Sequence, residues 1–153
     1  MERDQFFRDI IELKFDKSNI ILGGDLNQIE NPALDRFPTN NTYNPGWVGL
    51  TNIKINLNLT DSLRRKVYNI RNMTRITKIS SQLRSATRID YILVSTHLIE
   101  HISLSKSTYI NFSDHNQVVA KFGTNPINKP QSTQQWYKII PLESSSKQIT
   151  SSI

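Results

Sequence analysis

The segment 19–27, NIILGGDLN, constrains the fold more than any other part of the chain. It begins with a continuous apolar run, IIL, which is typical of a strand buried on both faces. Two glycines follow, and we expect them to end the strand, because a residue without a side chain lets the backbone turn. Asp25 and Asn27 come next and point to the same side of an extended chain. The segment therefore predicts a carboxylate and a carboxamide at the end of a buried strand. A strand followed by an ordinary turn fits the same letters.

The rest of the chain alternates between helical and extended patterns, which indicates a layered α/β architecture. Apolar residues at three-to-four spacing predict a helix over residues 2–14, and Thr60 or Asp61 is expected to cap a short helix that starts within residues 59–65. The extended patterns fall at residues 73–79, 88–95, 108–112 and 117–122. Between them, the segment 28–59 is expected to be largely irregular, with a helical turn that starts at Pro32, and the segment 80–87 a polar loop.

Two charged side chains stand out within these strands. Asp90 lies in the apolar segment RIDYILVS, and a buried carboxylate must be paired or protonated. His115 directly follows Asp114 at the start of the strand 117–122. A lone histidine is usually structural, but one beside a carboxylate, with Asp90 as a further partner, suits a general acid or base near neutral pH.

Composition narrows the function further. The 153 residues contain no cysteine, which excludes disulfides and thiolate metal sites and favours an intracellular setting. No apolar run approaches the roughly 20 residues that cross a membrane, and the charged N-terminus does not have the pattern of a signal peptide. The net charge is +6, and residues 61–90 hold eight basic and two acidic side chains. This block predicts a surface that faces phosphate, although an ordinary solvated face has the same composition.

Four segments in the order GGDLN, LTDSLRR, SATRIDYILVS and SDHNQVV resemble the C-terminal part of the endonuclease/exonuclease/phosphatase superfamily. Within it, the NPALDR and TRITKIS segments are most similar to the endonuclease domain of non-LTR (LINE-type) retrotransposons, relatives of abasic-site endonucleases. The resemblance covers residues 5–122, most of the chain. It implies an α/β (α+β) fold: part of a four-layer α/β sandwich with two facing, mainly antiparallel sheets and outer helices, whose N-terminal half is missing here.

The resemblance also implies roles for individual residues. Asp25 matches the aspartate that orients or deprotonates the attacking water, and Asn27 the asparagine that binds the scissile phosphate. Asp90 matches the buried aspartate that pairs with the catalytic histidine, His115, and Asp114 the acid near the metal. The expected contacts to DNA or its phosphates come from Thr77, Arg36, Arg64, Arg84 and Arg88. Asp35, beside Arg36, is expected to support the groove.

Hydrolysis of a phosphodiester needs an activated water and groups that neutralise developing negative charge. Oxygen ligands without cysteine suit Mg²⁺ or Mn²⁺ rather than zinc. We therefore expect Mg²⁺ (or Mn²⁺) as the cofactor, no small-molecule cofactor, DNA as the partner, and no membrane. A protein that acts on genomic DNA is expected in the nucleus.

The family's N-terminal half brings an asparagine, a metal-ligating glutamate and a tyrosine that nothing upstream of Ile20 can replace. We therefore expect poor metal affinity, weak or absent nuclease activity for this chain alone, and an uncovered sheet face that favours self-association. Residues 1–122 are expected to form the partial domain and residues 123–153, which are polar, a disordered tail.

Two alternatives to a retrotransposon endonuclease domain stay open. The chain is a non-catalytic remnant that binds nucleic acid through the segment 64–88, or it belongs to another branch of the superfamily, an abasic-site endonuclease or a phosphatase. Steeply salt-dependent binding without cleavage favours the remnant. Because the chemistry of the site is shared between branches, only tests with different substrates separate them.

Overall fold

The centre of the computed structural model is an antiparallel sheet with the strand order β1-β6-β3. Its strands are β1 (Ile21–Asp25), β6 (Asp90–Ser95) and β3 (Leu59–Asp61). The structure describes residues 3–13, 19–39, 47–66, 68–80 and 82–123. β6 lies in the middle because its side chains alternate between two apolar faces, with Leu93 and Val94 both completely buried.

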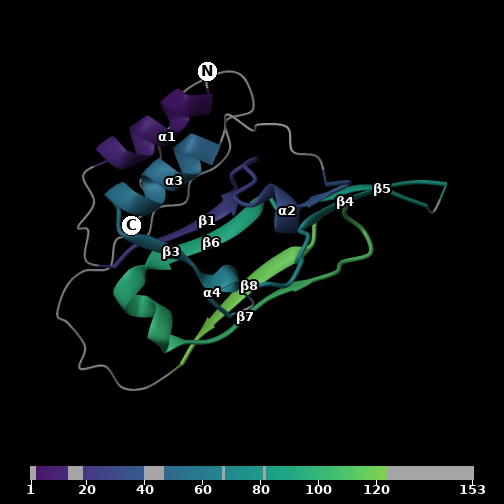
Figure 1. Cartoon of the computed structure of the whole chain (residues 1–153). Helices are drawn as coiled ribbons and strands as arrows, with labels where there is room; N and C mark the ends of the chain where they lie inside the picture. The colour runs from purple at the N-terminus through teal and green to yellow at the C-terminus, as the bar shows by residue number, and fades with distance from the viewer. Residues whose placement is uncertain (1–2, 14–18, 40–46, 67, 81, 124–153) are drawn as a thin grey trace.

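Two helices, α1 (Arg3–Glu12) and α3 (Trp47–Asn56), lie together on one face of this sheet (Figure 1). The core between helices and sheet is apolar, and its fully or nearly buried members include Phe7, Ile10, Leu50, Ile53, Leu57, Tyr91 and Leu93. The helix expected over residues 2–14 is confirmed. α3 is a correction, because it occupies part of the segment expected to be irregular. Residues 50, 53 and 57 turn toward the sheet at helical spacing, and that burial outweighs the polar composition around them.

The first strand departs from its prediction in two ways. β1 continues through both glycines to Asp25, since Gly24 adopts a φ of 153°, which a residue with a Cβ rarely adopts. β1 is also buried on one face only, because Ile21 is 47% exposed. The extension matters for function, because it keeps Asp25 in register with Asp90 on the neighbouring strand.

A second antiparallel sheet has the order β2-β5-β4, with strands β2 (Arg36–Phe37), β5 (Gln82–Thr87) and β4 (Arg75–Ile79). β4 and β5 form a hairpin that projects from the body of the molecule (Figure 1). The strand predicted over residues 73–79 is confirmed for its larger part, whereas the polar loop predicted over residues 80–87 is wrong. β5 forms despite its polarity because its backbone pairs with β4 on one side and with β2 on the other.

The remaining elements border the central sheet. α2 (Pro32–Asp35) starts at the predicted proline and α4 (Ser62–Lys66) follows the predicted cap Asp61, whose Oδ1 accepts from the backbone N–H groups of Leu63 and Arg64. The chain then forms the 3₁₀ helix η1 (Thr96–His101) and a hairpin of β7 (Ile102–Thr108) and β8 (Gln117–Phe122). β8 confirms its prediction, whereas the strand expected over residues 108–112 is wrong, because β7 precedes that segment.

The second face of the central sheet is partly covered. Val94 packs there with Ile99 and Ile102, next to the β7–β8 hairpin. Ile21, which pairs with Val94 across the ladder, lies 47% exposed. The prediction of an uncovered face is therefore correct for the β1 edge and wrong for the β6 side. Self-association through that edge stays a prediction.

The observed mixture of antiparallel sheets and covering helices confirms the predicted α/β class. Among the described residues, no helix has the length and apolar character needed to cross a membrane. The predicted tail lies outside the described residues from position 124 onward, so the division at residues 122 and 123 stays a prediction.

Candidate active site

Three side chains that are distant in sequence meet where β1 and β6 run side by side. Asp25 at the end of β1 is the register partner of Asp90 at the start of β6, so both carboxylates lie on one face of the sheet. His115 reaches them from a turn after β7. One ligand atom of each of the three residues lies within 4.8 Å of the others. The predicted convergence of Asp25, Asp90 and His115 is therefore present in the structure.

The side chain of Asp90 holds the ring of His115 in place. Nδ1 of His115 lies 3.0 Å from Oδ2 and 3.2 Å from Oδ1 of Asp90, and both side chains are half-buried. An ionised carboxylate only accepts hydrogen bonds. Nδ1 therefore carries a hydrogen and donates a hydrogen bond to Asp90. Nε2 is then left for a substrate, and Asp90 fixes the orientation of the ring.

Asp25 and Asn27 lie together at the exposed end of β1. The backbone N–H of Asn27 donates to Oδ1 of Asp25 at 2.8 Å, a local turn that fixes the carboxylate. Asn27 itself has a φ of 48°, a left-handed conformation that asparagine tolerates better than most residues. The predicted pair is thus an Asx turn rather than two neighbours of an extended strand.

The turn that carries His115 is attached to the edge of β4. Arg75 of β4 forms an antiparallel bridge with His115. The backbone N–H of Ile76 donates to the carbonyl of Asp114 at 2.8 Å, and that of Asn116 to the carbonyl of Thr74 at 2.6 Å. The side chain of Asn116 also donates to the carbonyl of Met73 at 2.8 Å. These bonds attach the segment 114–116 to the edge of β4, which sets the position of His115.

Thr74 connects this turn to Asp90, and the sequence analysis did not single it out. Its buried hydroxyl oxygen accepts from the backbone N–H groups of Ile89 at 3.0 Å and Asp90 at 3.1 Å. Its carbonyl accepts from Asn116, next to His115. Thr77, which is predicted to contact phosphate, is exposed on β4. Its contact stays a prediction. In the sequence, a buried threonine that accepts backbone hydrogen bonds looks the same as an exposed threonine that contacts phosphate. Only the packing of the strand in three dimensions tells the two roles apart.

Thr74→Val is expected to lower the free energy of unfolding by about 1–3 kcal/mol, because it removes the acceptor of two buried N–H groups while keeping the shape. It is also expected to lower activity by loosening Asp90 against His115. Urea denaturation and a cleavage assay measure the two effects. Thr74→Ser keeps the hydroxyl and should restore both; equal losses in the serine and valine variants would show that the methyl group matters instead.

Two arginines predicted to bind DNA form internal ion pairs instead. Arg88 is 1% exposed and bonds to Asp35 through Nε at 2.8 Å, to Asp61, and to Glu30 at 3.5 Å. Arg64 pairs with the same Asp35 and donates to the carbonyl of Ile70 at 3.0 Å. The guanidinium of Arg88 is buried and not available to a ligand, so its predicted DNA contact is wrong, whereas the contact of Arg64, whose side chain is 16% exposed, stays a prediction.

The charges of this cluster balance one another. Burial alone lowers the pKa of Arg88, but Asp61 and Asp35 together raise it above its ordinary value, so the guanidinium stays charged. Burial has the opposite effect on the neighbouring phenol and raises the pKa of Tyr91, whose hydroxyl donates to the carbonyl of Gln28 at 2.9 Å. Asp35, expected to support a groove, is fully buried as the common partner of two arginines. The cluster therefore stabilises the junction of α2, β3 and β6.

The other predicted contacts lie at the surface. Arg84 is exposed on β5 and Arg36 is half-buried on β2. Asp114 is exposed and pairs with Nε of Arg75 at 3.2 Å, outside the cluster of Asp25, Asp90 and His115. Its assignment as a metal ligand therefore stays a prediction, as do the DNA contacts of Arg36 and Arg84.

The cluster has donors that suit a divalent cation. Asp25 and Asp90 contribute carboxylate oxygens, and Mg²⁺ is commonly held by one or two carboxylates together with waters and substrate phosphates. Nδ1 of His115 is engaged by Asp90, whereas each carboxylate oxygen keeps a further lone pair, so the oxygens are the donors that can take a metal. Among the described residues, the donor set thus fits Mg²⁺ or Mn²⁺ better than zinc.

Comparison with solved structures finds the same fold in enzymes that process DNA. The chain superposes on the 3′-5′ exonuclease NExo from Neisseria meningitidis with a TM-score of 0.67 and 24% identity, over 78% of this chain and 53% of that one. A structure of the 3′ phosphatase NExo from Neisseria bound to a product DNA hairpin gives 0.62 and 23%, over 78% and 52%. The catalytic domain of Xenopus laevis APE2 gives 0.53 and 28%, over 70% and 38%.

The chain spans about half the length of the Neisseria structures that it matches. No protein-family model and no curated protein matches it. The fold is therefore that of exonuclease- and phosphatase-type proteins, as the superfamily resemblance predicts, and it is consistent with part of an α/β sandwich. None of these three structures is described as a retrotransposon protein.

Proposed function

We propose that this chain carries the aspartate–histidine part of the active site of a metal-dependent phosphodiester hydrolase that acts on DNA. The observation that carries the proposal is the meeting of Asp25, Asp90 and His115 within 4.8 Å, with the histidine held by Asp90. Solved structures with this fold include an exonuclease and a phosphatase bound to a DNA hairpin, which supports DNA as the substrate.

In this proposal the three residues divide the chemistry of hydrolysis. Asp25 accepts a proton from the attacking water, because its exposed carboxylate lies beside the reacting centre. His115, oriented by Asp90, presents Nε2 to the phosphate oxygens, where negative charge develops in the transition state. Asn27 supplies a neutral amide donor to the same phosphate. A divalent metal held by Asp25 and Asp90 would add charge neutralisation.

The finer assignment is the endonuclease domain of a non-LTR retrotransposon, which nicks target DNA. It rests on the resemblance of the segments 31–36 and 74–80 alone. Preference for intact AT-rich duplex over abasic DNA, or over a small phosphate ester, would support it. The localisation that follows is nuclear, where genomic DNA is cut.

Plasmid nicking by the 153-residue chain tests the proposed function. We expect slow nicking that requires Mg²⁺ or Mn²⁺, because the chain spans about half of the matched structures. Asp25→Ala should reduce it to background, since the variant removes the proposed base and a metal ligand. Binding of Mn²⁺, followed by electron paramagnetic resonance, should weaken in the same variant. Asp4→Ala, which removes an exposed carboxylate on α1, is the matched control and should change neither.

Two results would contradict the proposal. Nicking that is equal in the wild type and in Asp25→Ala would show that the cluster does not catalyse it. Absence of nicking at every metal concentration, with DNA binding that falls steeply with salt, would favour the non-catalytic alternative. Robust nicking lost in Asp25→Ala would support the function and contradict the expectation of weak activity alone.

A further inference from the structure

A hollow of about 350 Å³ lies beside the turn that carries His115. It is formed by β4 and by the segment 109–116, and its lining includes Ile76, Lys78, Tyr109, Asn111, Phe112 and Asp114. The volume is at the lower end of the range for small-molecule sites. The active-site cluster contains none of these six side chains, and no role proposed so far uses the two aromatic rings.

The two aromatic side chains of the hollow are unusually exposed. Phe112 is 86% and Tyr109 59% exposed. Large apolar side chains that gather at one surface commonly mark a binding site. Neither ring belongs to the two apolar core clusters, so core packing does not account for their presence here.

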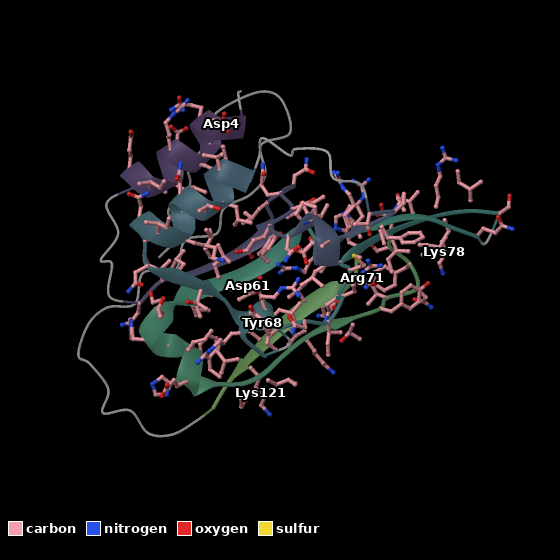
Figure 2. The ribbon with its side chains drawn as sticks, in the orientation of Figure 1. Asp4, Asp61, Tyr68, Arg71, Lys78 and Lys121 are labelled. Atoms are coloured by element: carbon pink, nitrogen blue, oxygen red, sulfur yellow. The ribbon has the colours of Figure 1, made fainter. Side chains whose placement is uncertain are left out.

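The surroundings of the rings are polar, with one cation, Lys78, and one carboxylate, Asp114, whose charge is balanced by its ion pair with Arg75. Nζ of Lys78 lies 5.7 Å from the centre of the Tyr109 ring, a cation–π contact at the mouth of the hollow. Figure 2 shows Lys78 on the projecting hairpin of β4 and β5. Asn111 adds an exposed amide with both donor and acceptor atoms. Lys78 also belongs to the basic block of residues 61–90. Aromatic faces beside a cation and an amide suit a nucleobase with its phosphate.

The hollow adjoins the candidate catalytic histidine through the chain itself. Asp114 and Asn116, on either side of His115, both line it. Ile76 and Asp114 line the hollow, whereas Arg75 and His115, which form the adjoining bridge, do not, although Nε of Arg75 reaches Asp114 at 3.2 Å. A nucleic-acid strand at the cluster would therefore reach the hollow by passing around the edge formed by residues 113–116.

We propose that this hollow binds an unpaired nucleobase of single-stranded DNA, stacked on Phe112 and Tyr109, with Lys78 on the adjacent phosphate. The base is unpaired because a ring inside a duplex already has neighbours on both faces and cannot stack on these side chains. The inference builds on the proposed function, since it adds a subsite for the flanking nucleotide to the same substrate, but its test does not require cleavage.

Binding of a short single-stranded oligonucleotide in EDTA, measured by fluorescence anisotropy, tests the subsite without metal or cleavage. Phe112→Ala and Tyr109→Ala should each weaken binding by about 5- to 100-fold, the usual effect of losing one base–aromatic stack. An oligonucleotide that contains 2-aminopurine should be quenched by the wild-type chain and much less by Phe112→Ala. Phe112→Trp should keep both affinity and quenching, whereas Phe112→Leu should lose them, because leucine has no aromatic face.

Tyr68→Ala is the matched control, because Tyr68 is 75% exposed and lies apart from Lys78 in Figure 2. It should leave binding and quenching unchanged, and circular dichroism should show all variants folded. Unchanged affinity and quenching in the Phe112→Ala, Tyr109→Ala double variant would overturn the subsite, as would failure of the wild type to bind the oligonucleotide. Dependence on Phe112 without any nicking would favour the non-catalytic alternative to the hydrolase and keep the subsite.

Discussion

Asp90→Asn is expected to reduce phosphodiester cleavage by about 10²- to 10⁴-fold while leaving the fold intact. The carboxylate of Asp90 accepts from Nδ1 of His115 at 3.0 Å, which orients the ring and selects its tautomer. An asparagine keeps the size but can present its NH₂ group to Nδ1, which favours the other tautomer of the histidine ring. Losses of this order follow when the carboxylate partner of a catalytic histidine is replaced by an amide.

The measurement is the initial rate of metal-dependent nicking over a range of pH, together with urea denaturation. Glu100→Gln, a charge-to-amide change on η1 away from the cluster, is the control and should keep the wild-type rate. A rate within twofold of the wild type in Asp90→Asn would contradict the assigned role of the pair.

Arg88→Met is expected to lower the free energy of unfolding by about 3–5 kcal/mol. The variant keeps an unbranched side chain of similar length but leaves Asp61, 2% exposed, without its cationic partner, and Asp35, 0% exposed, with Arg64 alone. An unpaired buried carboxylate must either stay charged in an apolar setting or take up a proton, and both are costly. A loss of this size is a large share of the stability of an ordinary domain.

Urea denaturation followed by circular dichroism measures this loss. Arg84→Met is the matched control: Arg84 is exposed on β5, so its replacement should change the stability by no more than about 0.5 kcal/mol. Adding Asp61→Asn to Arg88→Met should recover part of the loss, because it removes the buried carboxylate that Arg88→Met leaves without a cation. Two results would show that the buried ion-pair account is incorrect. One is that Arg88→Met unfolds at the same urea concentration as the wild type. The other is that Asp61→Asn lowers the free energy of unfolding as much in the Arg88→Met background as it does in the wild type.

Much of the candidate site could be predicted because its reacting residues lie in short segments that the sequence pattern identifies. Asp25, Asp90 and His115 each adjoin a recognisable apolar strand, and a polar group at such a strand end has few structural explanations. The strand 117–122 and the helix over residues 2–14 were likewise predicted from periodicity. The pattern is less informative for α3, where Ile53, Ile55, Leu57 and Leu59 alternate as in a strand although residues 47–56 are helical.

The basic segment 61–90 was the least well predicted. Counting its charges treats every arginine as a surface group, yet Arg64 and Arg88 point inward to Asp35 while Arg84 points outward. Which arginine finds a buried carboxylate depends on how α2 and β6 approach each other, and those elements lie more than fifty residues apart in the chain. The same limit applies to Thr74, whose role depends on backbone groups of residues 89, 90 and 116.

The amino-acid sequence alone determined the reacting groups, because the identity of a carboxylate or an imidazole does not depend on folding, and it determined the strands whose apolar runs need burial. Only the tertiary structure decided which charges serve the site and which hold the fold together. The physical reason is that burial and ion pairing join residues from separate elements, so a side chain's role is set by what packs against it rather than by its neighbours in the chain.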